Sequence, residues 1–122
     1  MDPFAVPEQL LAACVAATDT PMVISDATAP DYPMVWVNAA FEATSGYRAA
    51  EILGRNARLL QGPDTDQDTV KEFRVALDAG RSARARLLNY RPDGSAWWNE
   101  MHVSPLRDAA GTLTHFLGVH MV

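Results

Sequence analysis

The stretch Gly54-Arg55-Asn56-Ala57-Arg58-Leu59-Leu60-Gln61-Gly62 carries the most information about this chain. Glycines bracket it, and glycine commonly ends a helix or forms a turn, so we expect the stretch to lie among short helices and loops. Asn56 and Gln61 offer amide groups that could hold a hydroxylated linker, and Arg58 offers a permanent positive charge for an anion such as phosphate. The stretch therefore predicts part of a ligand site.

The residues on either side of this stretch predict an α+β domain. Helices are indicated by apolar residues spaced three and four apart, strands by short runs of branched and aromatic residues, and turns by clusters of Gly, Pro, Asn and Asp. Two strands, several small helices and three more antiparallel strands indicate an antiparallel sheet with helices on one face. In chain order the predicted elements are a helix over 7–17, strands 22–25 and 34–37, a short helix capped by Asn38 and ended by Gly46, a short helix at 51–53 ended by Gly54, a helix from Asp64 or Thr65 to Ala79, and strands 84–90, 96–104 and 114–120.

Composition and charge fit one globular domain. The chain has 122 residues with 48% hydrophobic content, which is long enough to bury one core. A formal net charge of -5 and the lack of a long basic run argue against a nucleic-acid surface. The single cysteine, Cys14, excludes an internal disulfide and fits a reducing compartment. No stretch reads as a signal peptide or a membrane span, so we expect a cytoplasmic protein that binds neither nucleic acid nor membrane.

Alternation along the last three strands puts one polar side chain on the apolar face of each. These are Asn89, Asn99 and His120. A buried amide or imidazole without partners costs about 1–3 kcal/mol, so three of them on one face suggest the polar edge of a bound flat heterocycle. Residues that could cover its rings, or let a ring lie close to the backbone, are Met101, Val103, Phe116 and Gly118.

The long helix carries a cation on its inward side. Arg74 falls within the stripe formed by Val70, Phe73 and Leu77. A guanidinium near a core face needs an anion, and Arg58 is a second cation that could share it. A planar ring with an amide-like edge, a polyol and one phosphate would suit all of these groups together.

Each candidate also has a purely structural interpretation. The two asparagines could bond sheet edges, and His120 could face solvent on the last strand. Arg74 could reach solvent along its aliphatic stem, or pair with Asp66 or Asp78. The prediction of a ligand therefore depends on the conjunction of these residues.

The opening stretch resembles the Gly-x-Asn-Cys-Arg-Phe-Leu-Gln motif of light-oxygen-voltage (LOV) domains, a branch of the Per-Arnt-Sim (PAS) fold. The similarity runs from about Met22 to the C-terminus. It implies an N-terminal flanking helix within residues 1–20, a LOV core with a five-stranded antiparallel sheet over 21–122, bound flavin mononucleotide (FMN) and absorption of blue light. Further matching motifs are Gly62-Pro63-Asp64-Thr65-Asp66, Asn89-Tyr90-Arg91 with Asp93-Gly94, Trp98-Asn99, Ser104-Pro105-Leu106-Arg107-Asp108 and Phe116-Leu117-Gly118-Val119.

The resemblance implies a role for each candidate. In the family, residues matching Asn56 and Gln61 contact the ribityl chain, and those matching Arg58 and Arg74 hold the phosphate. Two asparagines at the positions of Asn89 and Asn99 bond the pyrimidine edge of the ring. The positions that line the ring pocket correspond here to Val23, Ser25, Leu60, Val70, Phe73, Leu77 and Phe116.

Four residues depart from the family pattern. Ala57 stands where the family has the cysteine that bonds to the flavin under blue light, and a methyl group offers no thiolate. Leu59 replaces the usual phenylalanine, and Tyr32 occupies a position near the ring entrance that is often asparagine. His120 replaces a glutamine that bonds the flavin, and an imidazole offers different hydrogen-bonding groups from an amide.

Three functions follow from these residues as hypotheses. The first is a flavin-binding LOV core without thiol chemistry, expected to fluoresce, sensitise oxygen or accept an electron from Trp36, Trp97, Trp98 or Tyr90. The second is a chromophore-free PAS module that serves as a dimerisation or partner surface. Its support is an apolar set on the outer sheet face that the N-terminal helix or a second subunit could cover, formed by Leu88, Tyr90, Trp98, Leu117 and Val119. Under either hypothesis we expect a homodimer through this face and the N-terminal helix. A flavoenzyme is third and weakly supported, because no paired carboxylates, metal-ligand spacing or nucleophile with a base is evident, so we expect no enzymatic activity.

Overall fold

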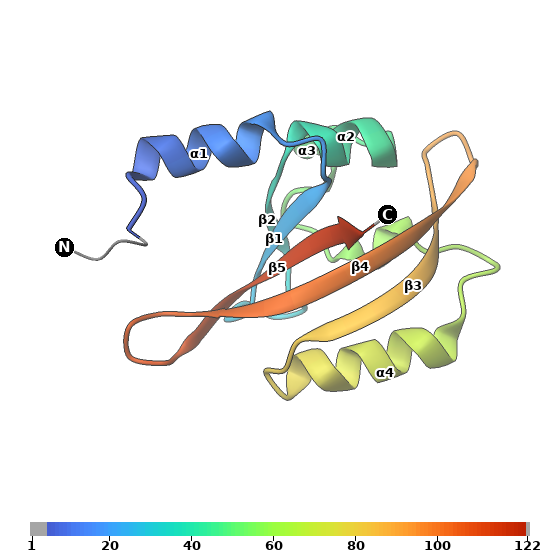
Figure 1. The fold of residues 1–122 in the computed structure, drawn as a ribbon. Helices are drawn as coiled ribbons and strands as arrows, with labels where there is room; N and C mark the ends of the chain where they lie inside the picture. The colour runs from blue at the N-terminus through green and yellow to red at the C-terminus, as the bar shows by residue number, and fades with distance from the viewer. Residues whose placement is uncertain (1–4, 122) are drawn as a thin grey trace.

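Five antiparallel strands form one sheet in the computed structural model, which describes residues 5–121. The order across the sheet is β2-β1-β5-β4-β3, so the N-terminal strand pair lies beside the last strand (Figure 1). The predicted α+β architecture is confirmed; residues 1–4 and 122 of the predicted segments 1–20 and 21–122 lie outside the described residues. The elements are α1 (Glu8–Ala17), β1 (Met22–Asp26), β2 (Met34–Val37), α2 (Ala39–Ser45), α3 (Ala49–Ile52), the 3-10 helix η1 (Ala57–Leu60), α4 (Gln67–Asp78), β3 (Ala83–Tyr90), β4 (Ala96–Arg107) and β5 (Leu113–Met121).

The strand register brings distant residues together on the inner face of the sheet. Gly118 of β5 lies opposite Val23 of β1 on one side and Val103 of β4 on the other. A Cβ atom added to Gly118 would lie 2.9 Å from Val23 Cγ1, so a larger residue would crowd this row. Small size at this position therefore lets three neighbouring strands meet closely under the helices.

Asn38 joins the start of α2 to the sheet. Its Oδ1 accepts from Phe41 N at 3.0 Å, as the predicted helix cap, and also from Met22 N at 2.9 Å. Its Nδ2 donates to the carbonyl oxygen of Thr20 at 2.8 Å. Because Asn38 is only 4% exposed, these three bonds satisfy a polar group inside the core. The adjoining core cluster consists of Val23, Met34, Val37, Phe41, Ile52 and Leu60.

The helix α4 begins slightly later than predicted. Asp66, rather than Asp64 or Thr65, is its N-cap and accepts from Asp68 N at 3.2 Å. Thr65 is used instead as a tertiary link, because its hydroxyl donates to the carbonyl oxygen of Leu88 at 2.6 Å. Propensity alone cannot separate neighbouring cap candidates, so the partner across the fold decides between them.

The strand β4 extends past Ser104, where the prediction ended it, to Arg107. The prediction was short because Pro105 cannot donate a hydrogen bond to a neighbouring strand. In the structure β3 begins at Ala83, opposite Val103, so the side of β4 that faces β3 has no partner strand at Pro105. The missing N–H therefore breaks no bond to β3.

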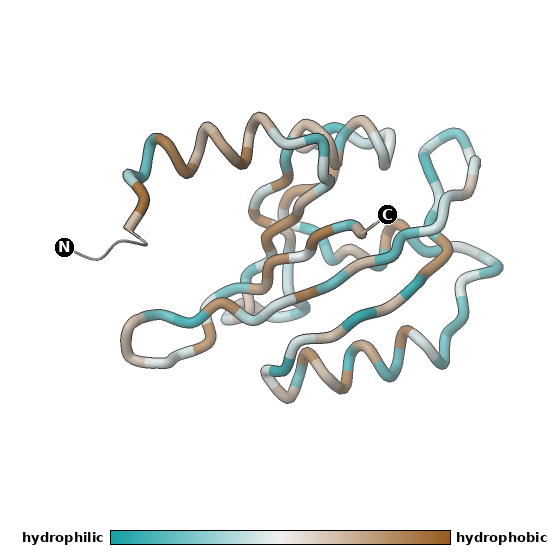
Figure 2. The backbone as a smooth tube through the Cα atoms, viewed as in Figure 1, coloured by the Kyte–Doolittle hydropathy of each residue, from teal (hydrophilic) through white to brown (hydrophobic). Residues whose placement is uncertain are grey.

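The helix α1 stands apart from the sheet (Figure 1). It has no buried residue, and Leu10 and Leu11 are 55% and 52% exposed. Hydrophobic residues recur along it, as Figure 2 shows. The apolar side of this helix is therefore not used within the part of the chain that the structure describes. Over residues 5–121 no helix combines the length and apolar character needed to cross a membrane.

Candidate functional site

A cavity of about 170 Å³ lies between the inner face of the sheet and the helices α2, η1 and α4. One water molecule needs about 15 Å³ on this kind of measure, so the cavity has room for a ligand the size of a ring system. Every predicted site residue except His120 lines it. These lining residues are Val23, Ser25, Asn56, Arg58, Leu60, Gln61, Val70, Phe73, Arg74, Leu77, Asn89, Asn99, Met101, Val103, Phe116 and Gly118.

Two apolar walls face each other across the cavity. Phe116 and Val103 on the sheet are 2% and 6% exposed, and Leu60 on η1 is 2% exposed. The helix α4 contributes its inward stripe, which reaches the cavity through Val70, Phe73 and Leu77. Apolar walls on both sides with polar groups at the ends suit a flat heterocycle with polar edges.

The amides of Asn89 and Asn99 form the polar edge of the cavity. Both residues are 3% exposed, and Asn99 Nδ2 donates to Asn89 Oδ1 at 3.0 Å. Among the described residues, the Asn89 amide nitrogen donates to no protein group. Because Asn89 lines the cavity and its amide nitrogen has no protein acceptor, this edge fits a ligand that presents a carbonyl or ring-nitrogen acceptor. The residues present therefore fit the pyrimidine edge of a flavin.

His120 is the one predicted site residue outside this cavity. Its Nδ1 donates to Asn99 Oδ1 at 2.9 Å, and its ring lies edge-on to Trp97 with 5.6 Å between the centroids. The imidazole is thus held by an amide and an aromatic ring on β4 instead of pointing into the cavity. Alternation placed His120 on the correct face, but this pairing decides where the ring ends, in a small hollow that shares Asn99, Met101 and Gly118 with the cavity.

Two arginines at the mouth of the cavity share one carboxylate. Arg58 Nη1 donates to Asp31 Oδ2 at 2.6 Å, and Arg58 Nη2 donates to Asp31 Oδ1, which makes a two-pronged pair. Arg74 Nη1 lies 3.6 Å from the same Asp31 Oδ1, while its Nε donates to Asp78 Oδ1 at 3.0 Å. The hydrogen bond from Arg58 holds the pKa of the Asp31 carboxyl below its usual value, and the same bond raises the pKa of Arg58. The two arginines predicted to share a phosphate thus also meet an acidic side chain of the chain itself, Asp31, which the sequence analysis did not single out.

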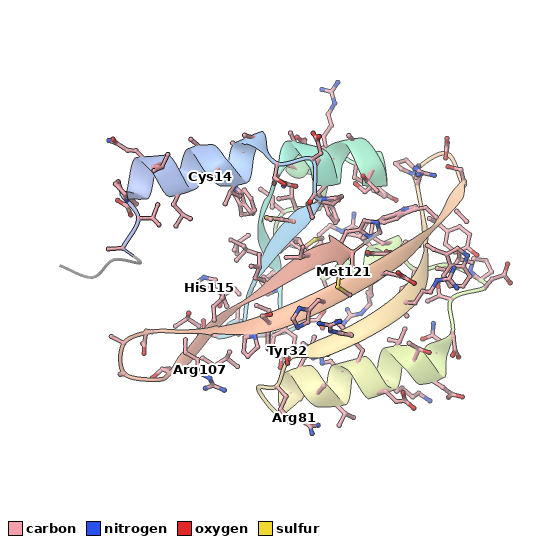
Figure 3. All side chains as sticks on the ribbon, viewed as in Figure 1. Cys14, Tyr32, Arg81, Arg107, His115 and Met121 are labelled. Atoms are coloured by element: carbon pink, nitrogen blue, oxygen red, sulfur yellow. The ribbon has the colours of Figure 1, made fainter. Side chains whose placement is uncertain are left out.

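Tyr32 lies between the sheet and α4 beside this pair, as Figure 3 shows. Its ring is edge-on to Phe116 with 5.2 Å between centroids, and the Arg74 guanidinium lies 4.6 Å from its ring centroid. Its hydroxyl donates to Asp78 Oδ1 at 2.6 Å, and this bond raises the pKa of Tyr32. The Tyr32 side chain thus covers part of the cavity mouth.

The backbone that delivers these two side chains is strained. Asp31 and Tyr32 have φ of 66° and 46°, the left-handed region that residues other than glycine seldom adopt. Each such residue costs about 1–2 kcal/mol, which the contacts of its side chain must offset. Asn56 contributes by donating from Nδ2 to the Asp31 carbonyl oxygen at 2.6 Å.

Four further residues line the cavity, of which Tyr32 and Ala57 were expected near the ring from the family resemblance and the other two were not. They are Tyr32, Phe41, Ala57 and Leu87. The only cysteine of the chain, Cys14, is exposed on α1 (Figure 3), so no thiol is among the residues that line the cavity. Leu87 could have been added from its alternation with Asn89, whereas Phe41 carries no signal in the sequence that separates it from an ordinary core residue.

Known proteins that resemble this chain carry related names. Residues 19–121 match the model of the PAS domain family. Phototropin-2 from Oryza sativa subsp. japonica is 46% identical over 99 residues, which cover 81% of this chain and 11% of that protein. Blue-light-activated histidine kinase 1 from Erythrobacter litoralis is 44% identical over 112 residues, which cover 92% of this chain and 31% of that protein. The chain therefore spans well under half the length of these two curated relatives.

A solved structure resembles the fold along most of its own length. It is described as "Flavin Analogue Sheds Light on Light-Oxygen-Voltage Domain Mechanism", with a TM-score of 0.84 and 42% identity over 93% of this chain and 83% of that chain. Identity at this level over nearly the whole of both chains exceeds what a shared fold alone requires. The chain accordingly belongs to the PAS domain family and, within it, to the light-oxygen-voltage domains.

Proposed function

We propose that this domain binds FMN in the cavity and absorbs blue light without forming a covalent bond between the flavin and the protein. When bound, FMN supplies a ring system that absorbs blue light. The observation that carries the proposal is the arrangement of one cavity with apolar walls, a buried amide edge and an arginine pair at its mouth, in a chain of the light-oxygen-voltage family.

The polar residues divide the ligand between them. Asn89 and Asn99 face the pyrimidine edge of the ring, and the unpartnered amide nitrogen of Asn89 donates to it. Arg58 and Arg74 bind the phosphate with charge-assisted hydrogen bonds. Gln61 lines the cavity beside η1 and donates to a hydroxyl of the ribityl chain.

Asn56 has a different task from Gln61. Its Oδ1 accepts from Arg58 N at 2.9 Å, and its Nδ2 donates to the Asp31 carbonyl oxygen. Both ends of its amide are therefore engaged by the protein. Asn56 serves the site as the N-cap that orders the start of η1, and it contacts the ribityl chain from this N-terminal end of η1.

Ala57 determines what happens after absorption. It lines the cavity with a methyl group at the position where family members carry the photoactive cysteine, so the lining residues offer no thiol to react. The excited flavin then decays by green fluorescence, by sensitising oxygen, or by accepting an electron from a nearby aromatic side chain. Trp97 is the buried candidate for the electron donor, at 9% exposure. Trp98 is 51% exposed and points to the opposite face of the sheet.

The test is optical. Purified protein is expected to be yellow and fluorescent, with no reversible loss of its blue absorption after illumination. Ala57→Cys is expected to introduce that reversible loss, and Ala57→Ser is the matched control, because its hydroxyl has similar size without thiol reactivity. Reversible bleaching in the unaltered protein would contradict the proposal, as would colourless protein after refolding with FMN.

We also propose that two copies associate through α1 and the outer face of the sheet. The apolar side chains of α1 are uncovered, and Trp98 on the outer face is 51% exposed beneath the Arg86 guanidinium at 4.0 Å. Paired apolar helices of this kind favour a two-fold dimer. Sedimentation velocity is expected to give a dimer for the unaltered chain and a monomer for Leu10→Glu with Leu11→Glu. Val75→Glu is the control, since Val75 is 62% exposed on α4, and an unchanged dimer in the α1 variant would refute the proposal.

A further inference from the structure

The Asp31 carboxylate lies where a bound anion would meet the two arginines of the cavity mouth. It accepts hydrogen bonds from both Nη1 and Nη2 of Arg58, and its Oδ1 lies 3.6 Å from Arg74 Nη1. Both guanidiniums also line the cavity. An anion that enters the cavity therefore meets cations whose hydrogen-bond donors are already in part engaged.

This arrangement is built into the fold instead of being a chance surface contact. Asp31 lies at a left-handed position of the turn between β1 and β2, and its carbonyl oxygen is bonded by Asn56 at 2.6 Å. The same turn positions Tyr32, whose hydroxyl bonds Asp78. The backbone thus holds the carboxylate against the arginines from two sides.

The charges of this cluster balance within the protein itself. Arg58 and Arg74 carry two positive charges, and Asp31 and Asp78 carry two negative charges at distances of bonding or near-bonding. A phosphate monoester brings about 1.5 to 2 further negative charges at neutral pH. The phosphate can bind the two arginines only if it displaces the Asp31 carboxylate or shares the arginines with it.

Since we take the proposed flavin site as given, we propose that Asp31 is a specificity-determining residue, which competes with the flavin phosphate for Arg58 and Arg74 and thereby lowers the preference for FMN over riboflavin. Riboflavin has the same ring and polyol but no phosphate, so Asp31 does not compete with it. The four side chains are 41–54% exposed, so salt screens the competition.

The experiment compares the affinities of flavin-free protein for FMN and for riboflavin, measured by quenching of flavin fluorescence at low salt and at high salt. Asp31→Asn removes the charge and keeps the shape, and asparagine tolerates the positive φ of this position. The ratio of the two dissociation constants is expected to shift about fivefold to tenfold toward FMN at low salt, from the loss of one unit charge beside the phosphate. The shift is expected to shrink at high salt.

The matched control is Asp19→Asn, which changes net charge equally at an exposed residue beyond the opposite end of β1. Arg58→Gln is expected to weaken FMN and leave riboflavin nearly unchanged. An equal ratio in Asp31→Asn and Asp19→Asn, or a ratio shifted toward riboflavin in Asp31→Asn, would overturn the inference, because Asp31 would then be neutral or would assist the phosphate. Absence of riboflavin and FMN binding in the unaltered protein would instead refute the flavin site itself.

Discussion

Replacing Gly62 with alanine tests how tightly the loop that ends the Gly54–Gly62 stretch packs against β3. A Cβ atom at Gly62 would lie 2.4 Å from both Cδ2 and Cε2 of Tyr90, whereas ordinary contacts are 3.4–4 Å. The tyrosine ring must therefore retreat by about 1 Å. That movement also breaks the hydrogen bond from Asp64 N to Tyr90 Oη, which is 3.1 Å long.

The expected cost follows from these two losses. Overpacking of a well-packed site costs about 1–3 kcal/mol, and a lost hydrogen bond adds about 0.5–1.5 kcal/mol. Gly62→Ala is therefore expected to lower the free energy of unfolding by about 2–4 kcal/mol, which for a domain of this size lowers the Tm by roughly 10 °C. Thermal and urea unfolding followed by circular dichroism measure both quantities.

A double-mutant cycle isolates the contact. In a Tyr90→Ala background the alanine at position 62 meets no ring, so its additional cost is expected to fall below about 0.5 kcal/mol. Gly54→Ala is the matched control from the same stretch, because its φ is 86° and no atom lies within 4 Å of its added Cβ. Its cost comes from backbone strain, about 1–2 kcal/mol, and is expected to be the same with or without Tyr90. Additive costs of Gly62→Ala and Tyr90→Ala would refute the steric reasoning.

Three further perturbations have defined outcomes. Asn38→Ala removes a helix cap and leaves the Met22 N–H and the Thr20 carbonyl without their partner. Urea unfolding is therefore expected to show a free energy of unfolding lowered by about 2–4 kcal/mol, and a decrease below about 1 kcal/mol would contradict the importance of this link. Asn89→Leu is expected to weaken FMN and riboflavin by the same factor, about tenfold or more, because it removes a donor to the ring edge and leaves the phosphate arginines intact; titrations that give unequal factors would contradict that assignment. The pKa of Asp31 is lowered in the folded state by Arg58 and that of Asp78 by Tyr32, so these carboxylates contribute stability above the pKa of unfolded aspartate, near 4, and lose it as the pH falls through their lower folded values. The free energy of unfolding, measured from pH 6 to pH 2, is expected to fall more steeply below about pH 4. The fall is expected to be shallower in the double variant Asp31→Asn, Asp78→Asn, and equal slopes in both proteins would contradict the role of these carboxylates.

Local patterns predicted the elements of this fold well, because their causes are local. Gly46 ends α2 in a left-handed conformation with φ of 77°, and Asn38 caps the same helix, as their residue types indicate. Alternation on the last strands correctly put Asn89 and Asn99 on the inner face, where both are buried. The alternation of apolar residues and the residue types at helix ends therefore predicted most of the secondary structure and the direction of the main polar side chains.

Pairings between distant segments could not be predicted in this way. The structural alternative for Arg74 included pairing with Asp66 or Asp78, and in the structure Arg74 bonds Asp78, four residues along the same helix. Its second partner, Asp31, comes from a turn on another element whose left-handed backbone no sequence pattern announces. The final position of His120 is of the same kind, because it depends on the Trp97 ring and the Asn99 amide after the strands have aligned.

The central place of β5 affects how the chain acquires its structure during synthesis. This strand pairs with β1 on one side and with β4 on the other, yet it is the last of the five to leave the ribosome. Met22 pairs with Val119, so this contact joins the first strand of the domain to the last. High contact order of this sort slows folding, since a long loop must close before the pairing stabilises it. The strand pair β1–β2 and the hairpin β3–β4 therefore cannot form one sheet before translation has delivered β5, which lies between them.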